Sequence, residues 1–298
     1  MKNRLRVFTL LICTLFVHGA FAETNRHRVK LEKAIAKSSS RNATPRLSSH
    51  IALIYDEQTQ RPLYDKNANA VVPIASITKL MTAMVVLDAM LSMDEEVSVA
   101  DDNLNKIKKS RSRLPVGMTL PRGELLKLAL MASENRAASA LARSYPGGSD
   151  AAVAAMNAKA RELGMGNTRF SDPTGLSKHN VSTAQDLVKM VAAARDYPLI
   201  RQYTTSTSHS IEGARGRMVR FSNTNPLVKS ASWDIGVSKT GYINESGRCL
   251  VMEANIDQRP VIIVLLNSWG NRTRVGDANR IKKWMESNNI QGRNTRRG

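Results

Sequence analysis

Cysteine is nearly absent from this chain of 298 residues, and other signatures of metal or cofactor chemistry are missing with it. The two cysteines, Cys13 and Cys249, stand alone, and no H-E-x-x-H pattern occurs, so a zinc site is not expected. Neither a P-loop nor a dinucleotide-binding glycine pattern is present. The sequence therefore predicts no metal ion and no bound cofactor.

Histidine is also scarce, which weighs against the commonest kind of serine hydrolase. No G-x-S-x-G elbow is present. His27 lies in a basic, polar stretch, and His179 and His209 lie in polar, loop-like sequence. A Ser-His-Asp triad is therefore disfavoured, and a serine nucleophile in this chain would need a different base.

No apolar run is long enough for a comfortable membrane span. The chain nevertheless starts with Lys2, Arg4 and Arg6, followed by the short apolar run VFTLLICTLFV and by AFA at residues 20–22. This order predicts a signal peptide over residues 1–22 that is cleaved on export, rather than an uncleaved anchor. Cleavage removes Cys13, so Cys249 can form no internal disulfide.

Acidic residues are outnumbered, with 25 Asp and Glu against 44 Lys and Arg. Without the three basic residues of the signal peptide, the mature charge is 41 − 25 = +16. Residues 23–47 and 286–298 are polar and basic, so both are predicted to be flexible, solvated segments. An exported basic protein is expected to meet an anionic envelope surface rather than nucleic acid, and the polar C-terminal end predicts no stable membrane anchor.

The ordered domain is expected to span residues 48–285. IALIYDEQ and RPLYDKNA predict a hairpin, and three further strand-like runs lie between residues 234 and 268. Helical patterns fill residues 122–197, and another closes the domain. We therefore predict an α+β fold in which distant segments complete an antiparallel sheet flanked by helices, with a mainly helical subdomain inserted at roughly residues 90–205.

Ser76 and Lys79 lie one helical turn apart in PIASITKLM, so their side chains share one side of a helix. The apolar residues around them fit the helical period: Ile77, Leu80, Met81, Met84 and Val85. Ser76 is near the helix start, where unpaired N–H groups can stabilise an oxyanion. Lysine is a poor base at its ordinary pKa of about 10.4, but burial or a second cation would disfavour its charged form.

An S-x-x-K pair is expected by chance about once in a chain of this length, so it needs support from other motifs. MASENRAA contains Ser133 and Asn135, and VSKTGY contains Lys239, Thr240 and Gly241. The order S-x-x-K, S-x-N, K-T-G is that of penicillin-binding proteins and class A β-lactamases. With the blocks NTRFSDPTGL and WDIGVSKTGYINESGRCLVM, the chain resembles the low-molecular-weight serine D-alanyl-D-alanine peptidases, in particular their endopeptidases of the penicillin-binding protein 7 type, over roughly residues 48–285.

The resemblance implies a β-lactamase/transpeptidase-like fold and a periplasmic enzyme that cuts the stem peptides of peptidoglycan. Ser76 would be the acylated nucleophile, Lys79 its proton acceptor, and Ser133 a relay of protons toward the leaving amine. β-Lactam antibiotics would be covalent inhibitors that acylate the same serine.

The same resemblance assigns the groups that would hold the substrate. Asn135 would hold the substrate amide together with Lys79, and Lys239 and Thr240 would bind its carboxylate side. Gly241 would let its strand approach the substrate closely. The oxyanion would be held by the backbone N–H groups of Ser76 and Tyr242.

Three alternatives share these motifs. A D-alanyl-D-alanine carboxypeptidase often adds a β-rich domain and an amphipathic anchor, for which the 298 − 241 = 57 residues after Gly241 leave too little room. A class A-like β-lactamase needs a glutamate in an E-x-x-L-N motif, which does not occur. A non-catalytic peptidoglycan-binding protein would be expected to have lost one of the motifs.

Arg136 is a departure from the family, in which aspartate is common at this position.

Overall fold

The computed structural model describes residues 44–101, 112–213 and 216–288. The predicted signal peptide lies outside the described residues, as does most of the two predicted flexible segments. Residues Arg46–Glu286 form one compact unit, to which the following description applies. Within the described ranges, no helix combines the length and the apolar character needed to cross a bilayer.

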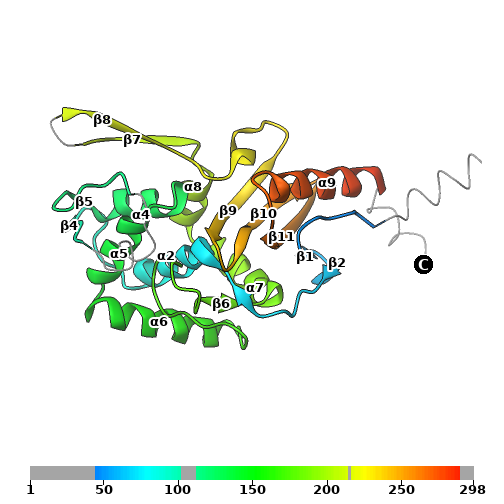
Figure 1. Ribbon diagram of the computed structural model, residues 1–298, viewed down its shortest axis with the longest axis horizontal. Helices are drawn as coiled ribbons and strands as arrows, with labels where there is room; N and C mark the ends of the chain where they lie inside the picture. The colour runs from blue at the N-terminus through cyan, green and yellow to red at the C-terminus, as the bar shows by residue number, and fades with distance from the viewer. Residues whose placement is uncertain (1–43, 102–111, 214–215, 289–298) are drawn as a thin grey trace, which may run out of the picture. The chain divides into compact units, whose positions relative to one another are not determined.

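A five-stranded antiparallel sheet of order β2-β1-β11-β10-β9 organises this unit (Figure 1). The N-terminal hairpin consists of β1 (Ile51–Asp56) and β2 (Arg61–Lys66), and the C-terminal strands are β9 (Asp234–Ile243), β10 (Gly247–Ile256) and β11 (Arg259–Ser268). Strand β1 pairs with β11, so that Ile51 lies opposite Leu266. The predicted hairpin, the succession of three C-terminal strands and the closure of the sheet by distant segments are therefore confirmed.

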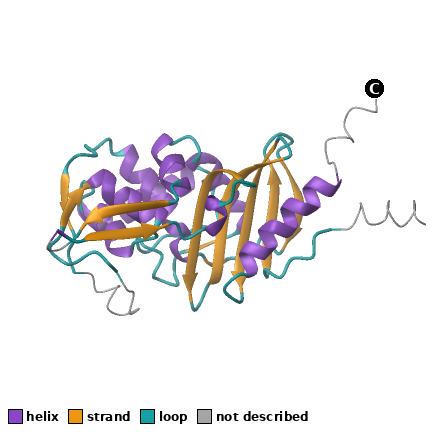
Figure 2. Cartoon of the chain, turned by 90° about the horizontal axis from the view of Figure 1, so that it is seen from above, coloured by secondary structure: helices purple, strands orange, loops and turns teal. Residues whose placement is uncertain are grey.

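Helices cover both faces of the sheet. Helix α9 (Thr273–Asn288) lies across one face (Figure 2), and α7 (Ala184–Ala194) packs against β1, β10 and β11 on the other. Because side chains alternate along a strand, Val251 belongs to the large core shared with the helices while Met252 points to the opposite face, and both are fully buried. Cys249 is also fully buried, in the same core as Val251.

The remaining helices form a layer beside the sheet. At its centre, the 3₁₀ turn η1 (Ala75–Ile77) leads into α2 (Thr78–Asp88), in which every residue from Thr78 to Val86 is buried. Around it lie α4 (Arg122–Met131), α5 (Asn135–Arg143), α6 (Gly148–Glu162) and α8 (Pro198–Thr205). The five residues that fit the helical period around Ser76 are all buried, with at most 3% of their surface exposed, as the sequence predicts.

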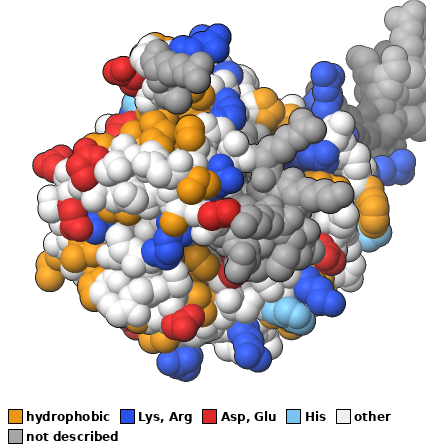
Figure 3. All heavy atoms as spheres, turned by 60° about the vertical axis from the view of Figure 1, so that its left-hand side comes forward, with side chains coloured by type: hydrophobic (Ala, Val, Ile, Leu, Met, Phe, Trp, Pro, Cys, Tyr) orange, Lys and Arg blue, Asp and Glu red, His pale blue; other side chains and the backbone are white. Residues whose placement is uncertain are grey.

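Short strand pairs and one further turn connect these elements. They are β3 (Val72–Pro73) with β6 (Val181–Ser182), β4 (Glu96–Ser98) with β5 (Thr119–Pro121), β7 (Ser208–Glu212) with β8 (Met218–Ser222), and the 3₁₀ turn η3 (Pro226–Lys229). On the face that carries β4, β5, β7 and β8, Lys and Arg side chains lie among acidic and uncharged ones rather than in a single patch (Figure 3).

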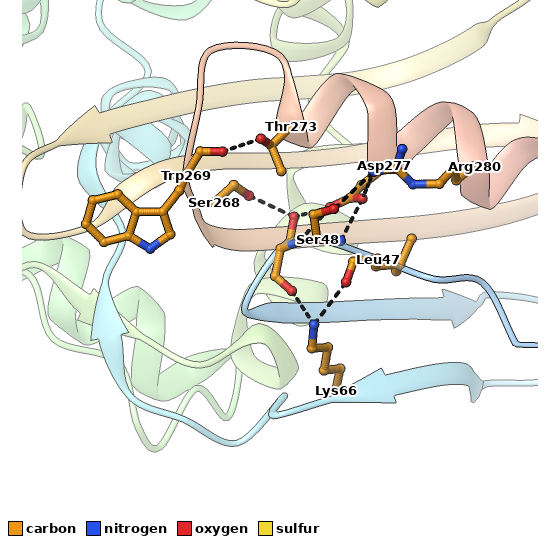
Figure 4. A network of polar contacts seen from close by, with 9 residues as sticks. Leu47, Ser48, Lys66, Ser268, Trp269, Thr273, Asp277 and Arg280 are labelled. Atoms are coloured by element: carbon orange, nitrogen blue, oxygen red, sulfur yellow. Dashed lines mark hydrogen bonds and ion pairs between the residues drawn. The ribbon is translucent and has the colours of Figure 1, made fainter.

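A buried carboxylate joins α9 to the start of the sheet (Figure 4). Asp277 accepts hydrogen bonds from the backbone N–H groups of Ser48 at 2.9 Å and Ser49 at 2.7 Å, and from the Ser49 hydroxyl at 2.5 Å. Burial alone would raise the pKa of Asp277, but these hydrogen bonds and one from Arg280 lower it overall. The Ser49 hydroxyl also lies 2.7 Å from that of Ser268, so the network fixes the end of β11.

Candidate active site

Ser76 lies in the η1 turn, and its backbone is enclosed by two other segments. Ala75 adopts a φ of 49°, a left-handed conformation that is unfavourable for a residue with a Cβ and persists only where packing enforces it. A Cβ at Gly175 would lie 2.0 Å from the Ala75 carbonyl oxygen, and a Cβ at Gly241 would lie 3.0 Å from the Ser76 nitrogen. Glycine at both positions therefore lets a loop and strand β9 pack directly onto the turn that carries Ser76.

Lys79 projects from the first turn of α2 toward Ser76. Its Nζ lies 2.9 Å from Ser76 Oγ, 2.7 Å from Asn135 Oδ1 and 2.6 Å from the Thr174 carbonyl oxygen. The last two atoms can only accept hydrogen bonds. A neutral Lys79 would therefore give its two N–H groups to Asn135 and Thr174 and direct its lone pair at the Ser76 hydroxyl. This is the geometry that a base needs to take the serine proton.

The electrostatic environment favours that neutral form. Burial lowers the pKa of Lys79 to about 7, although the charges of Asp172 and Glu134 act in the opposite direction. Burial also takes the pKa of Lys239 well below its usual value, and the charges of Lys79 and Arg274 lower it further. Of the two causes that the sequence leaves open for Lys79, burial is thus the larger. The repulsion between the two lysines is mutual and acts in the same direction.

The other two motifs meet this pair from separate elements. Ser133 occupies the junction between α4 and α5 with a φ of 59°, and Lys239 Nζ on β9 donates to its Oγ at 2.8 Å. Lys239 is buried, with 1% of its surface exposed. Thr240 Oγ1 donates to Thr224 Oγ1 at 2.7 Å. Five predicted side chains thus form two hydrogen-bonded sets. Lys79 links Ser76 and Asn135, Lys239 is bonded to Ser133, and the charge of Lys79 acts on Lys239.

Strand β9 also offers the site a free edge. It is the terminal strand of the sheet order, so one row of its backbone N–H and C=O groups has no strand partner in the sheet, and such an edge can pair with an extended peptide. Gly241 packs against the turn that carries Ser76. Tyr242 follows with 52% of its surface exposed.

A loop after α6 contributes groups for which the sequence motifs predict no role. Asp172 accepts from the backbone N–H groups of Thr174 at 2.7 Å, Gly175 at 2.9 Å and Ser177 at 2.9 Å. This Asx-type turn holds the Thr174 carbonyl against Lys79 and Gly175 against Ser76. The D-P-T-G pattern predicts such a turn, but it does not predict the contact between this turn and Lys79.

Arg274, at the start of α9, is a second group near the site that no sequence motif indicates. It is buried, and its Nε and Nη1 atoms have no hydrogen-bond partner within the described part of the chain. Its charge acts on Lys239. Unpaired buried N–H groups on a cation are unfavourable unless an anion satisfies them. Arg274 therefore places a buried positive charge close enough to Lys239 to act on it.

Arg136, the departure from the family pattern, points toward a neighbouring loop. Its Nη1 donates to the Leu114 carbonyl at 2.6 Å. Arg113, which precedes Leu114 in the chain, packs over the Phe221 ring with its guanidinium carbon 4.0 Å from the ring centroid. The two arginines thus connect residues 113–114 to α5 and β8.

Comparison with known proteins agrees with this geometry. A model of peptidase family S11, described as D-alanyl-D-alanine carboxypeptidase, matches residues 37–270. A D-alanyl-D-alanine endopeptidase of Pseudomonas aeruginosa is 47% identical over 97% of this chain and 91% of its own length. A D-alanyl-D-alanine endopeptidase of Escherichia coli is 44% identical over 87% of this chain and 84% of its own.

Solved structures confirm the predicted fold. The Streptomyces K15 DD-transpeptidase superimposes with a TM-score of 0.75 at 28% identity, over 81% of this chain and 98% of its own. The penicillin-binding protein D2 of Listeria monocytogenes in its ampicillin-bound form gives a TM-score of 0.69 at 28% identity, over 83% of this chain and 99% of its own. With its sheet, its inserted helices and its family match, the chain belongs to peptidase family S11, the serine-type D-alanyl-D-alanine peptidases.

Proposed function

We propose that this protein is a D-alanyl-D-alanine endopeptidase that hydrolyses the cross-links between peptidoglycan stem peptides through an acyl-enzyme on Ser76. The observation that carries this proposal is Lys79, which is buried, has a pKa of about 7 and lies 2.9 Å from Ser76 Oγ. Two relatives with 47% and 44% identity over most of the chain carry the endopeptidase name.

In the acylation step, Ser76 Oγ attacks the scissile carbonyl carbon while its proton passes to Lys79. The backbone N–H groups of Ser76 and Tyr242 stabilise the oxyanion of the tetrahedral intermediate. The C–N bond then breaks as Ser133 gives its hydroxyl proton to the leaving amine and takes up the proton that Lys79 accepted from Ser76. The 2.8 Å contact between Ser133 Oγ and Lys239 Nζ supports this relay, because the N–H donor of Lys239 holds the hydroxyl in place. Water then hydrolyses the acyl-enzyme and restores Ser76.

The carboxylate beside the scissile bond is held by Lys239 and Thr240, with Arg274 adding positive charge. Asn135 Oδ1 holds Lys79 at 2.7 Å, and Asn135 also holds the substrate amide. The substrate itself lies as an extended segment along the free edge of β9. Gly241 permits this approach because its missing side chain leaves β9 in contact with the turn of Ser76.

The protein acts outside the cytoplasm on the cell wall, and we place it in the periplasm after removal of residues 1–22. The peptidase domain would then be residues 48–285, between the basic segments 23–47 and 286–298, which are available to an anionic envelope surface. β-Lactams acylate Ser76; the ampicillin-bound form of the Listeria homologue supports this. A D-alanyl-D-alanine carboxypeptidase is the second candidate, favoured by the description of the matching family.

Muropeptide analysis separates the two activities. Purified mature protein is incubated with cross-linked muropeptide dimers and with pentapeptide monomers, and the products are separated by liquid chromatography. An endopeptidase converts dimers to monomers and leaves the terminal D-alanine of the pentapeptide in place. Release of D-alanine from monomers with intact dimers would establish the carboxypeptidase instead. Ser76→Ala serves as the control and should give neither product.

A further inference from the structure

An open hollow with a volume of about 430 Å³ lies directly beyond the active-site end of β9. Tyr242, Arg248, Trp269 and Asn271 contribute to its walls. Tyr242 follows Gly241, which packs against the Ser76 turn. One wall of the hollow is therefore made by the residue after the one that packs against the Ser76 turn, although none of the proposed catalytic side chains lines it.

Two exposed aromatic rings mark this hollow. Trp269 has 66% and Tyr242 52% of its surface exposed, and the other large apolar side chains exposed in the described part of the chain are aliphatic. Figure 4 shows the Trp269 ring extending away from the network that anchors its backbone. The Thr273 hydroxyl donates to the Trp269 carbonyl, and the preceding Ser268 is held by Ser49. A rigid backbone that presents an indole to solvent is typical of a binding surface.

Polar groups stand in fixed positions beside the rings. Arg248 lies opposite Tyr242 across the β9–β10 pair, and its guanidinium is 4.7 Å from the centre of the Tyr242 ring. Arg248 also donates to Asn271 Oδ1, and the Tyr242 hydroxyl donates to Asn244 Oδ1 at 2.9 Å. Because stacking and hydrogen bonding both restrain Arg248, its remaining donors face a ligand in a defined orientation.

A second open hollow, of about 480 Å³, continues from the first. Asn267 lines it together with Asn67 and Asn69, and the next residue, Ser268, lines the first hollow. A Cβ at Gly247 of the first hollow would lie 3.0 Å from the Asn267 side-chain oxygen, so the two are adjacent. The second hollow is thus rich in side-chain amides, which can both donate and accept hydrogen bonds.

We propose that these hollows bind the glycan strand of peptidoglycan, an inference that rests on the proposed function. The apolar face of a pyranose ring would stack on Trp269 and Tyr242, while its hydroxyl and acetamido groups would pair with Arg248 and with the amides. A chain of sugars accounts for two adjoining hollows. A peptide carboxylate would use Arg248 alone and leave the exposed indole and the second hollow without a role.

The test compares one cross-linked peptide with and without its sugars. The wild type and Trp269→Ala are assayed on muropeptide dimers that carry their disaccharides and on the same dimers after an amidase has removed them. We expect Trp269→Ala to lower kcat/KM at least fivefold on the sugar-bearing dimer, mainly through KM, and to leave the bare dimer unaffected. Met90→Ala is the control, because it truncates an apolar side chain that is 90% exposed and distant in sequence from Trp269. It should change kcat/KM on neither dimer.

Two readouts keep this inference separate from the proposed function. The rate of acylation by benzylpenicillin should be the same in Trp269→Ala and in the wild type, which shows that the variant is folded. Tryptophan fluorescence titrated with a soluble N-acetylglucosamine tetramer should change in the wild type and not in Trp269→Ala. Equal losses on both dimers would indicate a peptide contact, and no loss on either would remove the glycan site. Failure of the wild type to cut any dimer would instead refute the endopeptidase proposal.

Discussion

The ionisation of Lys79 controls acylation in this account, and it can be tested through the pH dependence of the reaction. With a pKa of about 7, roughly half of Lys79 is neutral at pH 7, whereas an ordinary lysine would be neutral in only about one molecule in 3,000. The second-order rate constant for acylation should therefore rise about tenfold per pH unit below pH 7 and level off above it. Stopped-flow fluorescence with benzylpenicillin between pH 5 and 9 measures this profile.

A charge-removing substitution gives the direction of the effect. Glu134 is buried, and its charge favours the protonated form of Lys79. Glu134→Gln should therefore lower the pKa of Lys79 and move the acidic limb to lower pH by up to about one unit. Glu96→Gln, at an exposed position of β4, is the matched control and should leave the limb in place. A limb centred near pH 10, or one that Glu134→Gln moves to higher pH, would show that Lys79 is not the base that controls acylation.

Three further predictions concern packing, folding and substrate charge. Gly241→Ala places a Cβ about 3.0 Å from the Ser76 nitrogen, so acylation by benzylpenicillin should slow between about 10-fold and 100-fold. The Tm should also fall, because the same Cβ would lie 2.9 Å from the Ile74 carbonyl oxygen. Asp277→Asn should lower the free energy of unfolding by about 1–3 kcal/mol at pH 7. The difference from the wild type should shrink as the pH falls below the ordinary carboxyl range. This follows because the pKa of Asp277 is lowered in the folded protein, so its carboxylate stabilises the fold only while it is ionised. Arg274→Gln should reduce cleavage of a dimer with a free carboxylate beside the scissile bond more than cleavage of its amidated analogue; equal losses on the two dimers would count against a role of Arg274 in binding the carboxylate.

The elements that carry the candidate site were predictable because their signals are local. The apolar residues that follow the helical period around Ser76 are all buried, and the junction that carries Ser133 falls where the two helical patterns meet. The sheet was predictable because the sequences of β1 and of the C-terminal strands each have a strand pattern of their own. These features depend on residues close together in the chain.

The groups that complete the site were not predictable in the same way. The Thr174 carbonyl that accepts from Lys79 is a backbone atom, so residue type gives no sign of it. Arg274 looks like any basic residue at a helix start, and only folding buries it near Lys239. The pKa of Lys79 is also unpredictable from the motif, because it is lowered by the burial of α2 among other segments. Burial of this kind arises from packing among distant segments, which no short motif encodes.

Intact-protein mass spectrometry after incubation with benzylpenicillin tests the acyl-enzyme on Ser76 most directly. We expect a single adduct that persists after removal of the free antibiotic, that peptide mapping locates on Ser76, and that is missing from Ser76→Ala. Rapid release of hydrolysed penicillin without a lasting adduct, or an adduct on Ser76→Ala, would contradict it.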